Sequence, residues 1–318
     1  MKKVLVTGGT GFVGSHVVEV LNHRGMHPVV ATRSPLEASF PWDSIVVDYL
    51  NQESVESAVG TVDAVVHSAI LNDFSVMQNN RRYAYDSYVV STQNLSNAAS
   101  DKPFVFISTD WVMDGTGHMV PEDEPPNPLN IYGVLKAFGE MVVKDRKHLG
   151  SIARVGGILG KHRLADQGPR QQDCGFGFFV TSMIEQLSKG KEFTVWMDDN
   201  VNMVASPSHA TEIGASIHRM IEREVEGTFH LMASESIGRM ELALLAANIF
   251  GLDSELITTG PVPPEGVFPA AVPRDTSLDC TQTRRILDLD PYSVADYLCM
   301  LKREMESGTL VPLTPQVT

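Results

Sequence analysis

The chain has 318 residues, 43% hydrophobic and 20% charged, which is ordinary for a globular protein with one large domain and a smaller one. Its formal net charge of −14 argues against nucleic acid or an anionic membrane surface as the main partner, because both require a positive surface. The three cysteines show no metal-ligand spacing, so we expect a reducing cytoplasm, with neither a disulfide framework nor a metal site. We also expect no membrane span, because no apolar run approaches roughly 20 residues.

Short apolar segments alternate with segments of helical periodicity over the first half of the chain. Strands are predicted at residues 3–7, 28–32, 44–48, 63–68, 104–108 and 152–156. Helices are predicted at residues 12–24, 54–59, 84–100 and 131–148. This alternation is typical of a parallel sheet covered by helices.

The segment VTGGTGFVGSH, residues 6–16, joins the first predicted strand to the first predicted helix. Its glycines follow two overlapping patterns, Gly9-x-Gly11-x-x-Gly14 and Gly8-x-x-Gly11-x-x-Gly14. Both patterns permit a tight turn, close approach of the backbone to a pyrophosphate and close packing of helix on sheet. A tight turn without a ligand is the alternative, but the strand before and the helix after predict dinucleotide binding.

The ends of the next strands indicate which dinucleotide binds. The second strand ends in VVATRSPLE, with Arg33 and Ser34 where an NAD site usually has an acidic residue. An arginine there suits the 2′-phosphate of NADP, so NADP(H) is favoured and NAD(H) is the alternative. The predicted cofactor contacts at the glycine loop and the strand ends are Gly8, Thr10, Gly11, Phe12, Val13, Gly14, Arg33, Ser34, Asp48, Tyr49, Ser68, Ala69 and Ile70.

The segment NIYGVLKAFGE, residues 130–140, carries Tyr132 and Lys136 four positions apart, on one face of a helix. An ammonium beside a phenol favours the phenolate, so the pair can pass a proton to or from a carbonyl or alcohol oxygen. By itself this spacing is common, and a half-buried tyrosine beside a solvated lysine is the alternative. In ISTDWVMDG, residues 107–115, Thr109 and Asp110 follow a strand directly, where α/β sheets bind ligands; local backbone capping is the alternative.

After about Gly160 the alternation of strands and helices breaks down. Residues 161–175 are polar and irregular, Phe176–Phe179 form an apolar run, and later helices are separated by short strand-like pieces. We therefore predict an NAD(P)-binding domain at 1–160. Residues 161–318 should form mainly a substrate-binding lobe, with some segments returning to the main sheet. The phenylalanine run is interpreted as the apolar anchor of the lobe, with an aromatic wall against a nucleotide base as the alternative.

Together, the glycine loop, DAVVHSA on the fourth strand, Ser108-Thr109 and the pair Tyr132/Lys136 resemble the extended short-chain dehydrogenase/reductase family. Within it, ISTDWVMDG, PLNIYGVLKAFGE and PRDTSLDCTQ are similar to the dTDP-4-dehydrorhamnose reductase branch. The resemblance covers nearly the whole chain. It implies an α/β fold, with a Rossmann-type doubly wound parallel sheet and a smaller C-terminal α/β substrate-binding lobe. It also suggests a homodimer.

The resemblance implies NAD(P)H-dependent reduction of a nucleotide-linked 4-keto-deoxysugar. Thr109 would hydrogen-bond the reacting carbonyl oxygen, Tyr132 would donate the proton, and Lys136 would bind the nicotinamide ribose and tune Tyr132. Tyr132 and Lys136 thus join the predicted cofactor contacts, and Asp110 matches the branch's aspartate beside the substrate. Dehydratases of the family resemble one another in a Thr-Asp-Glu run. This chain has Trp111 in place of the glutamate, so we expect carbonyl reduction with Trp111 as a wall for the substrate.

Departures from the family pattern leave the substrate open. Tyr88 stands where the family usually has an asparagine. A basic cluster, Lys161, Arg163 and Arg170, is a candidate grip for a diphosphate, and a solvated loop is the alternative. The competing functions are an NAD-dependent nucleotide-sugar epimerase and a non-catalytic regulatory or binding subunit, because a fold does not determine a function.

Overall fold

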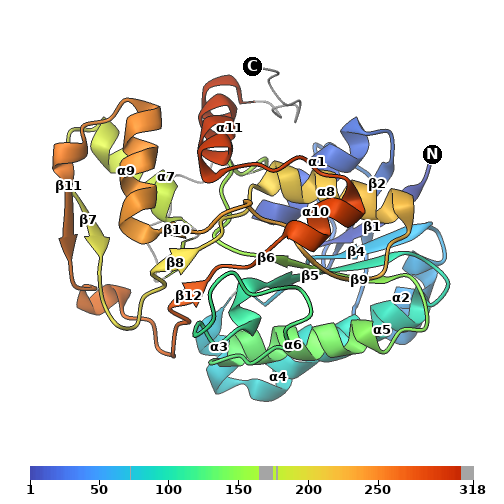
Figure 1. Cartoon of the computed structure of the whole chain (residues 1–318). Helices are drawn as coiled ribbons and strands as arrows, with labels where there is room; N and C mark the ends of the chain where they lie inside the picture. Colours follow the sequence, from blue (N-terminus) through green and yellow to red (C-terminus); the bar gives the residue numbers. More distant parts are fainter. Residues whose placement is uncertain (72, 165–174, 177, 309–318) are drawn as a thin grey trace.

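The computed structural model describes residues 1–71, 73–164, 175–176 and 178–308. Within these residues the main sheet has seven strands in the order β3-β2-β1-β4-β5-β6-β9, and all neighbours run parallel (Figure 1). The strands are β1 (Lys3–Thr7), β2 (His27–Thr32), β3 (Ser44–Val46), β4 (Ala64–His67), β5 (Phe104–Thr109), β6 (Gly150–Val155) and β9 (Gly227–His230). The strand order reverses between β1 and β4, which is where doubly wound sheets bind ligands. The predicted fold class is confirmed.

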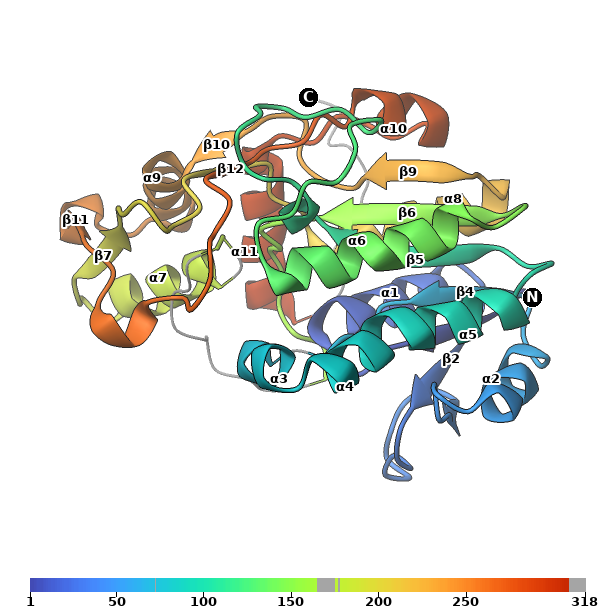
Figure 2. The same cartoon turned by 90° about the horizontal axis from the view of Figure 1, so that it is seen from below.

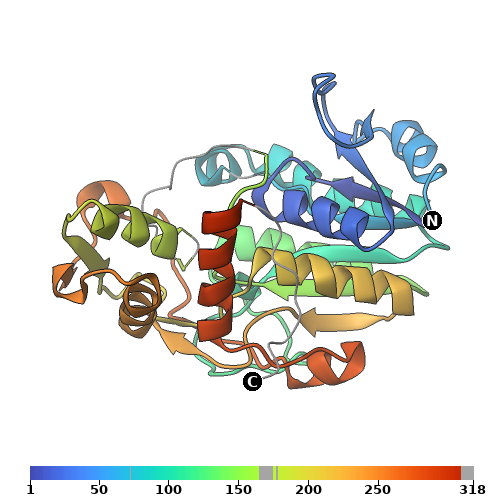
Figure 3. The same ribbon diagram turned by 90° about the horizontal axis from the view of Figure 1, so that it is seen from above.

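Helices cover both faces of the sheet, because its strands are apolar on both sides. On one face, the helices α1 (Phe12–His23) and α8 (Ala210–Arg223) share a core with Val4 and Val6 (Figure 3). On the other face, the helices α2 (Gln52–Val59), α5 (Ser91–Ala98) and α6 (Ile131–Lys144) share a core with Leu5 (Figure 2). Successive residues of β1 therefore enter different cores, as the two-residue period of a strand requires.

The predicted helix at residues 84–100 is interrupted in the structure. Here α4 (Arg81–Tyr85) is followed by a π-helical turn, η1 (Asp86–Val90), and then by α5. The Thr92 hydroxyl of α5 donates at 2.5 Å to the carbonyl of Tyr88 in this turn. A π turn shifts the helical register locally, so the 3.6-residue periodicity of the sequence does not reveal it. The helix α3 (Phe74–Asn79) precedes α4.

The predicted helix at residues 131–148 ends four residues early, at Lys144. The segment after it is anchored to the end of α5, because the Arg146 guanidinium donates to the carbonyls of Ser96, Ala99 and Lys102. Leu149 then adopts a left-handed conformation with φ 58° and leads the chain into β6.

A smaller lobe lies beyond the carboxyl ends of the main strands (Figures 1 and 2). Its helices are α7 (Phe179–Ser188), α9 (Arg239–Phe250) and α11 (Val294–Ser307), whose apolar faces form one core. Two small sheets complete it, with the orders β11-β7 and β10-β8-β12. Their strands are β7 (Phe193–Trp196), β8 (Val204–Ala205), β10 (Ile237–Gly238), β11 (Ile257–Gly260) and β12 (Asp275–Thr276).

Residues 161–318 contribute to both bodies. The helix α8 and the strand β9 follow lobe segments in the chain, yet they complete the main sheet and one of its helical layers. Leu287, at the end of α10 (Thr281–Leu287), joins the same core. None of the helices in the described part of the chain has the length and apolar composition needed to cross a bilayer.

Candidate active site

The glycine loop after β1 has the geometry of a phosphate cradle. Gly8 has φ +69°, and its carbonyl accepts a hydrogen bond from the Gly11 amide at 2.9 Å. A Cβ atom at Gly14 would lie 2.1 Å from the Gly8 oxygen, so only glycine fits there. The helix α1 begins without a side-chain cap or an acidic residue in its first turn, which leaves its amides available to an anion. These residues fit a dinucleotide's pyrophosphate.

The loop after β4 lies directly against the glycine loop. The amides of Ser68 and Ala69 donate to the Thr7 hydroxyl, each at 3.1 Å. A Cβ atom at Gly8 would come within 2.8 Å of the Ala69 nitrogen. The predicted cofactor residues at the ends of β1 and β4 are thus neighbours, and Ile70 next to them is exposed.

The candidates for the adenosine end lie at the ends of β2 and β3. Arg33 and Ser34 are exposed, and the Arg33 guanidinium donates to the Tyr83 hydroxyl at 3.4 Å. The Asp48 carboxylate accepts from the Leu50 amide at 3.0 Å, and the Tyr49 hydroxyl donates to the Ala31 carbonyl at 2.9 Å. Asp48 and Tyr49 therefore make local contacts, while Arg33 and Ser34 face solvent.

Thr109, Asp110 and Tyr132 meet beyond the end of β5. Thr109 donates to the Asp110 carboxylate at 3.0 Å, and Asp110 begins a short 3-10 helix, η2 (Asp110–Val112). Tyr132 lies in the first turn of α6, which approaches η2 closely because Gly133 has no side chain. A Cβ atom there would lie 2.2 Å from the Trp111 carbonyl oxygen. The Tyr132 ring contacts Trp111 edge-on at 6.1 Å between centroids.

Burial dominates the titration of these groups. Burial raises the pKa of Tyr132 to about 12, against a hydrogen bond with Thr109 that lowers it, so the phenol stays protonated at neutral pH. Burial lowers the pKa of Lys136 to about 7, although the Glu140 carboxylate acts in the opposite direction. Burial also raises the pKa of Asp110 to about 6, against hydrogen bonds from Thr276 and Thr109 that lower it.

Lys136 is held by its surroundings rather than by a direct ion pair. Its ammonium donates to the Ile107 carbonyl at 2.7 Å and lies 4.8 Å from the centroid of the Phe106 ring. The nearby Glu140 is paired with Arg154 at 2.9 Å and accepts from the Ser108 hydroxyl at 2.6 Å. The hydrogen bond to Ile107 thus holds the lysine at the end of β5, one helical turn from Tyr132.

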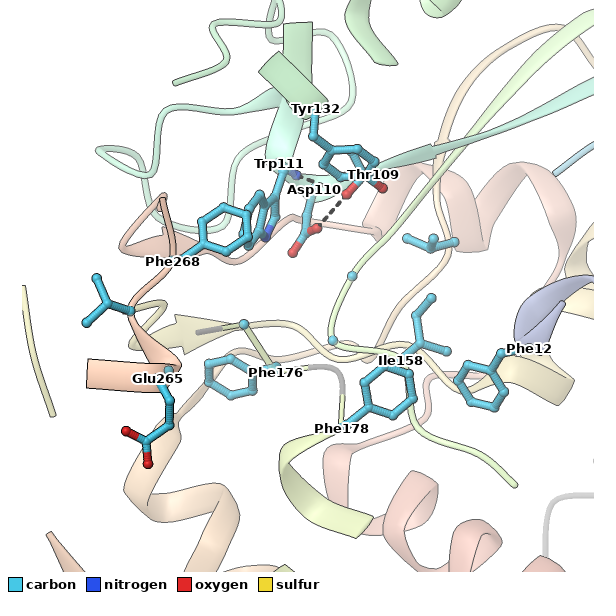
Figure 4. Close-up of a pocket in the computed structure, with 16 residues that line it drawn as sticks. Phe12, Thr109, Asp110, Trp111, Tyr132, Ile158, Phe176, Phe178, Glu265 and Phe268 are labelled. Carbon is cyan, nitrogen blue, oxygen red and sulfur yellow. Dashed lines mark hydrogen bonds between the residues drawn. The ribbon is translucent and has the colours of Figure 1, made fainter. Parts of the chain in front are cut away.

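A cavity of about 520 Å³ opens between the ends of β5 and β6 and the lobe (Figure 4). Six of the sixteen residues in its wall are aromatic, and the carboxylates are those of Asp110 and Glu265. The lining residues are Phe12, Thr109, Asp110, Trp111, Tyr132, Val155, Gly156, Gly157, Ile158, Gly175, Phe176, Phe178, Glu265, Gly266, Val267 and Phe268. Thr109, Asp110, Trp111 and Tyr132 are therefore brought together at one cavity.

The lobe supplies wall residues that the sequence did not indicate. Phe268 meets Trp111 edge-on at 5.6 Å, and Glu265 lies in the short helix η4 (Pro264–Gly266). Neither belongs to a motif, so no signal in the sequence could have identified them. Phe176 is buried in the lobe core, as the interpretation of the phenylalanine run as an apolar anchor expects, and it also lines the cavity.

Arg163 has a different place from the one predicted. Its side chain is 5% exposed and pairs with Glu19 of α1 at 3.1 Å and with Glu304 of α11 at 3.0 Å. It is absent from the cavity lining, so we revise its role. Instead of contacting the substrate, it links its own segment to α1 and α11 through two ion pairs. The reason is electrostatic, because the fully buried Glu304 requires a cation. Arg170, the third member of the basic cluster, lies outside the described residues.

The fold and the site define the class as an extended short-chain dehydrogenase/reductase. The model of the RmlD substrate binding domain matches residues 1–302, and the chain belongs to this family. It is 27% identical over 302 residues to the probable low-salt glycan biosynthesis reductase Agl14 of Haloferax volcanii, covering 93% of this chain and 96% of that protein. It is 25% identical over 293 residues to methionine adenosyltransferase 2 subunit beta of Bos taurus, covering 88% and 81%.

A solved structure with the same fold is the dTDP-4-dehydrorhamnose reductase of Bacillus anthracis in complex with NADP. The two chains superpose with a TM-score of 0.75 at 21% identity, covering 95% of this chain and 98% of that one. UDP-sugar 4-epimerases also have this fold. The relatives therefore include reductases, epimerases and an enzyme subunit.

Proposed function

We propose that this protein reduces the 4-keto group of a nucleotide-linked deoxysugar with NADPH or NADH. The observation that supports this most directly is the meeting of Thr109 and Tyr132 at the cavity, with Lys136 fixed one turn away on α6. The glycine loop beside this cavity fits a dinucleotide. The family membership of the chain points to the same chemistry.

In this mechanism a nicotinamide cofactor, when bound, would supply the hydride for the carbonyl carbon. Tyr132, protonated at neutral pH, donates its proton to the carbonyl oxygen. The Thr109 hydroxyl holds that oxygen beside the phenol. Lys136 is buried and donates to the Ile107 carbonyl, and we assign it the binding of the cofactor ribose that the resemblance implies.

The substrate side favours reduction over dehydration. A dehydratase would use a second acid after Asp110, and Trp111 occupies that position. Trp111 packs edge-on between Tyr132 and Phe268, so it closes the cavity as a wall. Asp110 remains the carboxylate beside the substrate. Its oxygen would lie 2.2 Å from a Cβ atom at residue 156, and glycine at that position makes room for it.

The cofactor proposed is NADP(H), with NAD(H) as the alternative. Arg33 is exposed at the end of β2, where a 2′-phosphate would be bound. Separate titrations of the protein with NADPH and with NADH test this preference. Equal affinities would remove the role assigned to Arg33.

The function is tested by mixing the purified protein with NADPH and a panel of nucleotide-linked 4-keto sugars. Loss of the reduced-nicotinamide absorbance with one of them is the expected result. An epimerase would instead retain NAD through purification and interconvert nucleotide sugars without added cofactor. Binding of NADPH without oxidation by any sugar would contradict the reductase proposal.

The second candidate is a non-catalytic subunit of another enzyme. It is favoured by the relative in Bos taurus, whose name describes a subunit and which matches over most of this chain. Tyr88 stands where the resemblance leads us to expect an asparagine, which is a departure from the enzyme pattern. Cofactor binding with no turnover would favour this candidate.

We further propose a homodimer through α4, α5 and α6. Phe138 and Met141 of α6 are 42% and 61% exposed, which suits a helix face that packs on a second copy. The molar mass in solution, from light scattering, tests this. A monomer at micromolar concentration would contradict it.

A further inference from the structure

A chain of buried hydrogen bonds runs behind the proposed cofactor site. It joins Thr7 of β1, His67 of β4 and Thr92 of α5, whose side chains are all shielded from solvent. The Thr7 hydroxyl lies 2.7 Å from Nδ1 of His67, and Nε2 of His67 lies 3.1 Å from the Thr92 hydroxyl. Thr92 in turn donates to the Tyr88 carbonyl in the π-helical turn.

The direction of each hydrogen bond in this chain follows from the number of protons available. Thr92 has one hydroxyl proton, which it gives to the Tyr88 carbonyl, so its oxygen accepts from His67 and Nε2 carries a hydrogen. Burial, and secondarily the charge of Lys136, lowers the pKa of His67 to about 3, so the ring is neutral. Its Nδ1 therefore accepts the proton of Thr7.

The same chain ends on the loop that flanks the glycine loop. Because the Thr7 proton goes to His67, both lone pairs of its oxygen are free for the amides of Ser68 and Ala69, which donate at 3.1 Å. The Ala69 nitrogen is the atom that a Cβ at Gly8 would approach within 2.8 Å. Each donor and acceptor in this series of hydrogen bonds thus has a partner. These hydrogen bonds hold the loop after β4 in place against the glycine loop.

We propose that His67 is a positioning residue for the cofactor. It acts through the Thr7 hydroxyl, which holds the amides of Ser68 and Ala69. The inference rests on the proposed function, because it assumes that a dinucleotide lies along these two loops. A protonated His67 would point Nδ1–H at Thr7, whose oxygen already accepts two amides, and would repel Lys136. The neutral ring with hydrogen on Nε2 is therefore the state that holds the loop.

The first test compares two substitutions at Thr7. Thr7→Val keeps the shape but removes the hydroxyl, and should weaken NADPH binding about tenfold. The Ala69 amide and Nδ1 of His67 lose their partner, and the Ser68 amide keeps only its contact with the Thr7 carbonyl at 3.3 Å. Thr7→Ser keeps the hydroxyl and should bind within about twofold of the wild type. Fluorescence titration gives the affinities, and thermal unfolding shows whether each variant is folded. Equal NADPH affinity of Thr7→Val and the wild type would overturn the inference.

The second test needs no variant and no turnover. Nitrogen-15 NMR of histidine-labelled wild-type protein should show His67 neutral, with hydrogen on Nε2, and without titration between about pH 5 and 8. Hydrogen on Nδ1, or titration in that range, would overturn the hydrogen-bond chain. If the wild type binds neither NADPH nor NADH, the proposed function fails and the cofactor role of His67 fails with it. The NMR result would still decide the hydrogen-bond chain separately.

Discussion

The nucleotide-binding half and the lobe are built in different ways. In the main sheet, β5 is buried at all six positions, and successive strands alternate with helices along most of the chain. In the lobe, the strands have two to four residues and pair across long separations, with Phe193 of β7 opposite Ile257 of β11. Local periodicity therefore suffices to predict the first half, whereas the lobe depends on distant partners.

The two regions also divide the proposed chemistry. Thr109, Tyr132 and Lys136 come from β5 and α6 of the main sheet and its helices. Phe176 and Phe268 come from the lobe and close the cavity from the other side. Changes in the first group should affect turnover, and changes in the second should affect affinity for the sugar.

The largest effect is expected from Tyr132→Phe. Without the phenol proton, kcat should fall by about 10²–10⁴-fold, while the affinity for NADPH stays unchanged. Steady-state kinetics with the best 4-keto sugar measure this. Tyr85→Phe is the matched control, because Tyr85 is 44% exposed and does not line the cavity. A Tyr132→Phe variant with full rate would refute the proton-donor role.

The next effect concerns the junction of the two regions. Arg163→Met leaves the Glu304 carboxylate buried without its cation, and should lower the free energy of unfolding by about 3–5 kcal/mol. Denaturant titration measures this loss, and the KM for the sugar should not change. Lys161→Met, at an exposed neighbouring position, is the control. A raised KM at unchanged stability would restore Arg163 as a substrate contact.

A pH-dependent effect is expected at Asp110. Because burial raises its pKa to about 6, the folded protein binds this proton more tightly than the unfolded chain does. The stability from this group is present below about pH 4 and is lost as the pH rises through about 6. Asp110→Asn should therefore be more stable than the wild type at pH 8, by about 2–3 kcal/mol, and equal to it near pH 4. If Asp110→Asn were no more stable than the wild type at pH 8, burial would not destabilise the charged Asp110 carboxylate.

The smallest effect is expected in the lobe wall. Phe268→Ala removes the aromatic contact with Trp111, and should raise the KM for the sugar about tenfold with a smaller change in kcat. Leu244→Ala, which is exposed on α9 and away from the cavity, is the control. A loss of kcat as large as that of Tyr132→Phe would break the division of roles between the two regions.

The sequence by itself determined the doubly wound sheet and the meeting of Thr109 and Tyr132. The sheet follows from local periodicity, because short apolar segments alternate with helical ones. The expectation that Thr109 and Tyr132 act together came from the resemblance of their motifs to the family. Only the tertiary structure decided the π turn at Tyr88, the burial of Arg163 against Glu304 and the place of Phe268 in the cavity wall. Each of these depends on a partner far away in the chain or on a local change of helical register. Neither leaves a periodic trace in the residues themselves.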